Sequence, residues 1–331
     1  MSRLTPAWFL FLFAPVTAEF LSGSSPITNP ILVLINLLLY GPGVLMIREL
    51  RVRWGKGWLA VFILSFAYTV VEEGLMLNTL FDPTKNTAGR SHGVNWVWTV
   101  GMLVVHSLIS IFLPILTAEA VYSRRARESW ISSKAFVLML LALAANVVGF
   151  GRLIAPNDRP PFLDYAIELG FVAACLLVAK FLPGPRRLEA STGDGSEEGR
   201  PATGSPRRLF FVSLFGTILL FVVSFAAPAM NMSAWIMVAA MVGVYLGFLA
   251  VLARFRTFDP RLPALSKLAA AGGIITFWLM VSPMAAFGKG NPSPLIAAVP
   301  MVWFLLSARR RLLRETLEGT EVREALAGGV G

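Results

Sequence analysis

The sequence predicts an all-α transmembrane helix bundle that crosses the bilayer about ten times, with both termini in the cytoplasm. Three observations lead to this fold class: the composition, the spacing of long apolar runs, and the distribution of basic residues. The chain of 331 residues is 56% hydrophobic and only 15% charged, whereas soluble domains contain roughly 25% charged residues. The composition therefore excludes an ordinary soluble protein and predicts a multi-pass protein of the cell membrane.

The apolar runs have about the length that a helix needs to cross a membrane, roughly 20 residues. A Pro-, Gly- and Ser-rich stretch over 183–208 separates six runs from the four that follow and is too polar to fold alone. The predicted organisation is a six-helix region with the candidate site over 1–182, a flexible cytoplasmic linker over 183–208, a four-helix region over 209–308 and a charged cytoplasmic tail over 309–331. The expected membrane segments are 6–22, 31–47, 58–80, 95–122, 135–155, 162–182, 209–229, 232–253, 266–286 and 293–308.

Basic residues gather in alternate connections between these runs. All but five of the 29 Lys and Arg residues fall on one side of the predicted bundle. Because positive charge accumulates in cytoplasmic loops, this asymmetry places both termini inside the cell. An alternative for the first segment is a cleaved signal peptide, since the small residues Val16-Thr17-Ala18 follow a short apolar region. The five exceptions are Lys85, Arg90, Arg152, Arg159 and Lys289.

Several function classes are excluded by the residues that the chain contains. The net charge of +10 belongs to the loops of a membrane protein, so no nucleic-acid partner is predicted. Cys175 is the single cysteine and lies in an apolar run, which excludes a disulfide framework. His92 and His106 are the two histidines, so a His-rich metal site is excluded, although one His with carboxylates could hold a metal. No cofactor or metal is predicted; the expected partners are the lipid bilayer and an unidentified peptide, lipid or small-molecule substrate.

Glutamates inside membrane segments are the strongest candidates for function, because an ionisable group there costs about 2.5 to 3.5 kcal/mol. Glu72 and Glu73 lie deepest, roughly 11 Å from a segment end. Ser65, Tyr68 and Thr69 share a helix face with Glu72, so Glu72 is predicted to face the protein interior. Glu73 lies on a mainly apolar face and is expected to carry a proton and to play a supporting role. Snorkelling or ion pairing is expected for three further glutamates, which lie near segment ends. These are Glu19, Glu119 and Glu168.

His106 and Asn146 extend this candidate site to the next two segments. His106 shares one helix face with Thr99, Ser110 and Thr117. His106 and Asn146 are predicted to lie at about the same depth in the membrane as Glu72. A carboxylate beside an imidazole can deprotonate water, and an amide can hold an oxyanion, so the three residues together predict a hydrolytic site. The alternative is that His106 and Asn146 join helices by hydrogen bonds.

These segments resemble the CAAX-protease and bacteriocin-processing family of intramembrane glutamic proteases over residues 58–155. Glu72-Glu73 matches the glutamate pair of that family, and Met102 to His106 matches its second motif, with Met in place of Phe. Ala142 to Asn146 matches the third motif with Ala in place of His, and Leu77 occupies the position of an Arg. The resemblance implies a membrane-embedded hydrolase in which Glu72, His106 and Asn146 are catalytic.

Two other functions remain open at this point. A proton-coupled carrier would use Glu72 and Glu73 as titrating groups in a transport pathway, and the Gly41-Pro42-Gly43 interruption of the second segment favours this reading. A non-catalytic membrane scaffold would use its basic loops and the arginines of 309–314 to contact anionic lipid or a cytoplasmic partner.

Overall fold

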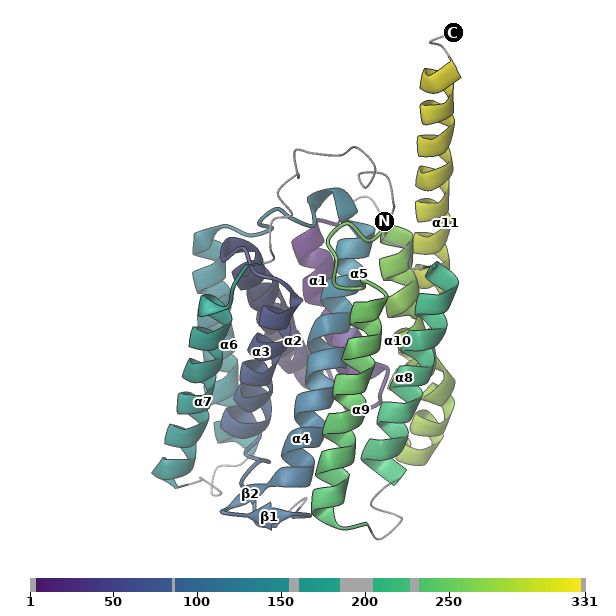
Figure 1. Ribbon diagram of the computed structural model, residues 1–331. Helices are drawn as coiled ribbons and strands as arrows, with labels where there is room; N and C mark the ends of the chain where they lie inside the picture. The colour runs from purple at the N-terminus through teal and green to yellow at the C-terminus, as the bar shows by residue number, and fades with distance from the viewer. Residues whose placement is uncertain (1–3, 85–86, 155–160, 185–204, 227–231, 329–331) are drawn as a thin grey trace.

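The computed structural model describes residues 4–84, 87–154, 161–184, 205–226 and 232–328, and its ribbon is shown in Figure 1. Helices dominate this part of the chain, together with one short antiparallel hairpin, β1 (Arg90–Ser91) and β2 (Val94–Asn95). The α-helices are α1 (Pro6–Pro15), α2 (Pro30–Arg53), α3 (Trp58–Thr69), α4 (Trp96–Val105), α5 (Leu113–Val121), α6 (Ser133–Ile154), α7 (Phe162–Phe181), α8 (Pro206–Ala226), α9 (Ala234–Arg254), α10 (Ala264–Lys289) and α11 (Ser293–Gly328). Three π-helical segments continue α-helices: η1 (Val16–Phe20), η2 (Val70–Met76) and η3 (His106–Phe112), and a short 3₁₀ turn, η4 (Ser123–Arg125), follows α5.

The predicted fold class is confirmed, because a helical segment occupies each of the ten predicted apolar runs. Eight of these segments are long and apolar enough to cross a membrane. The first, Pro6–Phe20, is shorter. The last helix, α11, continues through the stretch predicted as a charged tail, where an ion pair of 3.1 Å between Arg311 and Glu315 joins successive turns.

The continuous helix formed by α4, η3 and α5 lies at the centre of the bundle. In its most apolar 18-residue stretch, 72% is buried inside the bundle. The side chains of Ile111, Phe112, Leu113 and Ile115 are fully buried. The apolar stretches of α6, α7, α8 and α9 are much less buried. The exposed side chains of these four helices are mostly large and apolar. An apolar outer surface around a packed centre is the arrangement expected in a bilayer.

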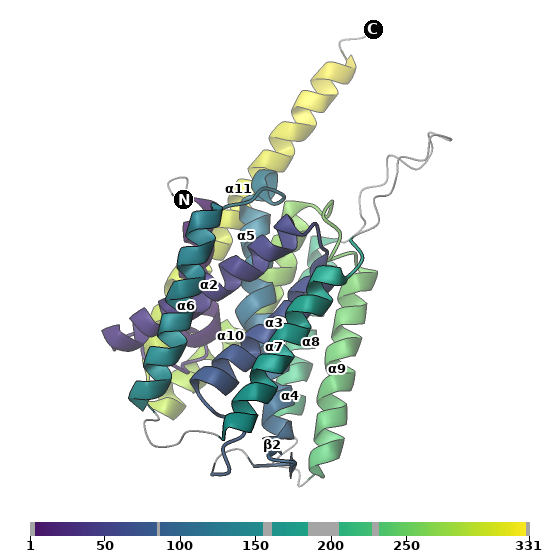
Figure 2. The same ribbon diagram turned by 90° about the vertical axis from the view of Figure 1, so that its left-hand side faces the viewer.

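The two ends of the bundle differ. The start of α1 and the free end of α11 lie at one end, and the β1–β2 hairpin lies at the other (Figures 1 and 2). At the first end, Tyr122 donates a hydrogen bond to the carbonyl of Leu4, and Arg311 donates one to the carbonyl of Val121. The linker residues 185–204 lie outside the described residues. The end with α11 is the one that the distribution of basic residues assigns to the cytoplasm.

A buried ionic cluster lies at the α11 end of the bundle. The Arg48 side chain is fully buried and bonds to Glu49 at 2.8 Å and to the carbonyls of Ala126 and Glu128 at 2.7 and 2.5 Å. Its guanidinium also lies 3.6 Å from the ring centroid of Trp130. Glu119, expected to be paired or snorkelling, accepts hydrogen bonds from Arg51 at 3.0 and 3.2 Å. The cluster therefore ties α2 to α5 and to the loop that follows it.

Small residues let α8 and α10 approach closely. A Cβ atom at Gly273 would overlap the carbonyl oxygen of Phe210 and would lie 2.9 Å from the backbone nitrogen of Leu214. A Cβ at the neighbouring Gly272 would make only ordinary contacts, 3.8 Å from the Phe210 side chain. Backbone contact of this kind requires glycine, as at many interfaces between transmembrane helices.

Candidate functional site

The three π-helical segments carry the candidate site. Glu19 lies on η1, Glu72 and Glu73 lie on η2, and His106 begins η3. A π-helical turn closes its hydrogen bonds one residue later than an α-helical turn, and such turns frequently occur at functional sites. In this chain the backbone bond from Leu77 to the carbonyl of Glu72 is one of these longer closures. The irregular turns thus place all four ionisable side chains on neighbouring helical segments.

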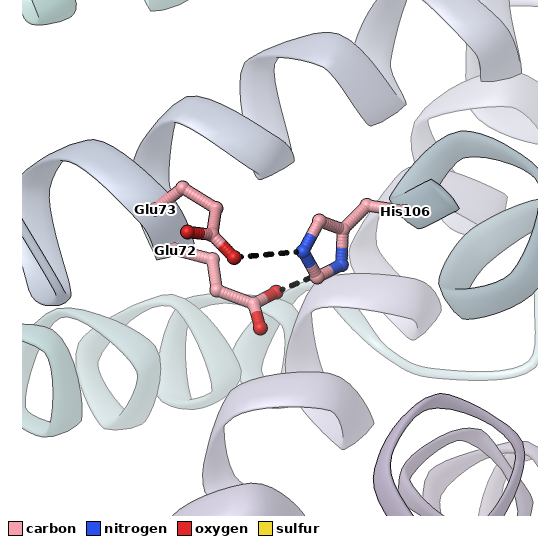
Figure 3. A group of neighbouring side chains, drawn as sticks. All are labelled: Glu72, Glu73 and His106. Carbon is pink, nitrogen blue, oxygen red and sulfur yellow. Dashed lines mark hydrogen bonds and ion pairs between the residues drawn. The ribbon is translucent and has the colours of Figure 1, made fainter. Parts of the chain in front are cut away.

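The imidazole of His106 lies between the two glutamates of η2 (Figure 3). His106 Nε2 is 3.2 Å from Glu73 Oε1, and His106 Nδ1 is 3.4 Å from Glu72 Oε2. His106 Nδ1 is also 3.0 Å from the hydroxyl oxygen of Ser110. Glu72, Glu73 and His106 are all at most 5% exposed, so each contact lies away from water and is electrostatically strong.

Glu73 differs from its predicted setting on an apolar face. Its second oxygen, Oε2, accepts a hydrogen bond from the Thr79 hydroxyl and one of 3.2 Å from Trp98 Nε1. Trp98 Nε1 also donates to the Thr79 hydroxyl oxygen at 3.0 Å. The prediction assumed regular α-helical spacing, in which adjacent residues point about 100° apart. The π-helical turn and the length of the glutamate side chains bring both carboxylates to His106.

A chain of hydrogen bonds joins Glu72 to Glu19. The buried Tyr40 hydroxyl contacts Glu72 Oε1 and, at 2.7 Å, Glu19 Oε1. Ser25 donates to the other oxygen of Glu19 at 2.7 Å. A hydroxyl has one proton to donate, so Tyr40 can satisfy both carboxylates only when one of them is itself protonated. Tyr40 therefore joins the two carboxyl groups into one hydrogen-bonded chain.

The cluster forms one wall of a cavity of about 750 Å³. Glu19, Glu72, Glu73 and His106 line this cavity. Exposed residues such as Ser24 and Lys289 also line it, so it opens to the surface there. The opposite wall is apolar and includes Leu220, Phe221 and Phe225 of α8 and Phe277, Trp278 and Met284 of α10. The cavity thus combines an acidic and imidazole wall with an apolar wall.

The structure brings Glu72, Glu73 and His106 together but does not bring Asn146 to them. Asn146 Nδ2 donates a hydrogen bond of 3.0 Å to the carbonyl of Ile35 on α2, and Asn146 is not among the described residues that line the cavity. The expectation that Asn146 meets the cluster used depth alone, which does not determine the direction that a side chain faces. Its observed contact is the helix-joining hydrogen bond that was the alternative.

Sequence reasoning missed three contributors to the cluster: Glu19, Tyr40 and Trp98. Glu19 was interpreted as a snorkelling residue because it lies near a segment end, yet its carboxylate faces Tyr40. Tyr40 precedes the Gly41-Pro42-Gly43 interruption, which does not break α2, since the helix runs from Pro30 to Arg53. A Cβ at Gly43 would overlap the ring of Tyr68, so this glycine permits close packing of α2 against α3.

Glu168 is a second buried acidic group, separate from the cavity lining. It is 2% exposed, and neither carboxylate oxygen has a hydrogen-bond partner in the described part of the chain. Its side chain lies against Gly74 of η2, where a Cβ would overlap Glu168 Oε1. The side chain of Glu168 therefore packs against the back of the segment that presents Glu72 and Glu73.

The fold and the site together define a polytopic α-helical membrane protein with a buried carboxylate and imidazole cluster. A protein-family model described as an uncharacterized membrane protein family matches residues 9–317, so the chain belongs to that family. No curated protein and no solved structure matches the chain. The match begins within α1 and ends within α11.

This family membership corrects the resemblance to the CAAX-protease and bacteriocin-processing family, which was wrong. The family matched over 9–317 is a different one, and the chain departs from the protease pattern at Leu77, Met102 and Ala142. Glu, His and Asn are among the polar residues that transmembrane bundles use for several purposes. Short motifs of these residue types therefore do not by themselves establish membership of the protease family.

Proposed function

We propose that the protein is a membrane-embedded hydrolase acting on an amphipathic peptide or lipid. The observation that carries this proposal is the His106 imidazole between Glu72 and Glu73 on the wall of the 750 Å³ cavity. An imidazole beside a carboxylate is a general acid and base pair. The apolar wall opposite suits a substrate with acyl or apolar side chains, which a bilayer supplies.

In the proposed reaction, Glu72 accepts a proton from a water molecule whose oxygen attacks the carbonyl carbon of the substrate. Glu72 passes this proton to His106, and His106 gives a proton to the leaving group as the bond to that group breaks. Glu73 holds His106 through Nε2, and Thr79 and Trp98 hold Glu73.

Substitution of Glu72 and His106 tests this proposal. In lipid nanodiscs, the wild type is expected to hydrolyse a member of a panel of peptides and lipid esters. Glu72→Gln and His106→Ala are each expected to lower the rate about a hundredfold, since each removes a proton-transfer group. Glu168→Gln is the matched control, because it replaces a buried glutamate that does not line the cavity, and it is expected to keep the wild-type rate.

Thermal unfolding of each variant separates loss of catalysis from loss of fold. The hydrolase proposal fails if the folded Glu72→Gln variant retains the wild-type rate, or if hydrolysis is lost equally in Glu168→Gln.

A proton-coupled carrier is the second candidate, and the hydrogen-bonded path from Glu19 through Tyr40 to Glu72 favours it. Carboxylates joined in this way within a bundle can serve as a proton relay. In liposomes with an imposed pH gradient, a carrier is expected to show solute-dependent proton flux that Glu19→Gln and Tyr40→Phe abolish. Proton flux that is unchanged in both variants contradicts the carrier.

A further inference from the structure

We infer that Glu72, Glu73 and His106 form a binding site for one divalent transition-metal cation. One ligand atom from each residue can be chosen so that the three atoms lie within 4.8 Å of one another. All three side chains are at most 5% exposed. This inference deepens the proposed function at the same site, and its consequence for catalysis rests on that proposal.

The donor set selects the class of cation. One imidazole with two carboxylates suits Zn²⁺ or Mn²⁺, whereas Mg²⁺ and Ca²⁺ prefer oxygen ligands alone. Ligands at about 2.1 Å from an ion lie roughly 3.4 Å apart in a tetrahedral site. His106 Nε2 and Glu73 Oε1 are already 3.2 Å apart, and binding requires Glu72, whose Oε2 contacts His106 Nδ1, to turn toward the same ion.

The second nitrogen of His106 has the partner that a metal-binding histidine needs. With Nε2 on the ion, Nδ1 lies 3.0 Å from the Ser110 hydroxyl oxygen, which can accept its proton. Such a hydrogen bond fixes the tautomer and the orientation of the imidazole. The Thr79 and Trp98 bonds to Glu73 Oε2 leave its Oε1 facing His106.

Charge balance is an independent argument for the cation. Glu19, Glu72 and Glu73 line the cavity with a single imidazole. Among the described residues that line it, the one basic side chain besides His106 is Lys289, which bonds instead to the carbonyls of Ser22 and Gly23. Glu72 Oε2 is buried without a hydrogen-bond partner in the described part of the chain, although His106 Nδ1 lies 3.4 Å away. With one proton shared between Glu19 and Glu72, two carboxylates still face one neutral imidazole, and a divalent cation compensates this buried negative charge.

A bound cation changes what the site can do. Water bound to such an ion loses a proton near neutral pH, so a nucleophile forms without a strong base. Glu72 can hold the ion with one oxygen and accept the water proton with the other.

Metal binding by the purified full-length chain tests the inference. After removal of any His tag, the protein in detergent is freed of metal with EDTA. It is then titrated with Mn²⁺ or Zn²⁺, and the bound metal is measured by electron paramagnetic resonance for Mn²⁺ or by elemental analysis for Zn²⁺. The wild type is expected to bind one equivalent. Glu73→Gln and His106→Ala are expected to weaken binding at least about tenfold, while Glu168→Gln binds as the wild type does.

Several outcomes overturn the inference: no binding by the wild type, equal binding by folded Glu73→Gln, or displacement of Mn²⁺ by equimolar Mg²⁺. Because Glu73→Gln preserves the shape of the side chain, it remains informative if His106→Ala does not fold. Hydrolysis by a wild type that binds no metal would overturn the metal site and leave the hydrolase. Metal binding without hydrolysis of any substrate would leave the metal site and overturn the hydrolase.

Discussion

Replacing Gly273 by alanine is expected to separate α8 from α10 and to destabilise the fold by more than about 3 kcal/mol. The added Cβ would overlap the carbonyl oxygen of Phe210 and would lie 2.9 Å from the nitrogen of Leu214. Both are backbone atoms, so no rotation of a side chain relieves the overlap. Because α8 and α10 also supply the apolar wall of the cavity, the same substitution is expected to disturb substrate binding.

Gly272→Ala is the matched control for this prediction. It makes the same chemical change one residue earlier in α10, where the new Cβ would meet the Phe210 ring at 3.8 Å. Alanine also favours the helix by roughly 1 kcal/mol over glycine, so stability is expected to be unchanged or slightly higher. Thermal unfolding in detergent and the size-exclusion profile measure the difference. Equal unfolding temperatures for Gly273→Ala and Gly272→Ala would contradict the close packing of the two helices.

Replacing Arg48 by methionine is expected to lower stability by about 3–5 kcal/mol, because it breaks a buried ion pair and leaves Glu49 with the partly exposed Arg53 as its remaining cationic partner among the described residues. Arg48 and Glu49 are both 0% exposed and form an ion pair of 2.8 Å. The substitution also removes hydrogen bonds to the carbonyls of Ala126 and Glu128. These carbonyls belong to the loop after α5, so the loop is expected to detach from α2.

Arg125→Met provides the comparison for a solvated ion pair in the same loop. Arg125 bonds to Glu128 at 2.9 Å, but the two side chains are 49% and 55% exposed. Exposed pairs contribute at most about 1 kcal/mol, so the unfolding temperature is expected to change little. Limited proteolysis of the loop provides a second measurement. If both variants unfold at one temperature, the buried ion pair does not hold the loop in place.

The helices could be predicted from the sequence because their cause is local. Apolar runs of membrane length, and basic residues between them, are visible without any tertiary contact. The continuation of α11 beyond 308 was less visible, since four of the six residues of 309–314 are arginines. Its helical conformation is supported by pairs such as Arg311 and Glu315.

The candidate site could be predicted only in part. Glu72 and His106 stood out because ionisable groups are rare inside membrane segments. The role of Glu73 could not be predicted, because regular α-helical geometry turns it away from Glu72, and no sequence pattern marked the π-helical turn. Asn146 had a plausible depth but bonds to Ile35 of α2. Which face of a helix meets which neighbour depends on packing between segments far apart in the sequence.

The π-helical segments have a consequence for insertions and deletions. Each π-helical turn accommodates one more residue than an α-helical turn of similar rise. Deleting one residue from η2, such as Val71, can therefore restore a regular α-helix while α3 and the chain after Met76 keep their places. The same deletion in the middle of a regular helix would rotate everything beyond it by about 100°. A single-codon change in η2 can consequently alter how Glu72 and Glu73 are presented, without redesign of the bundle around them.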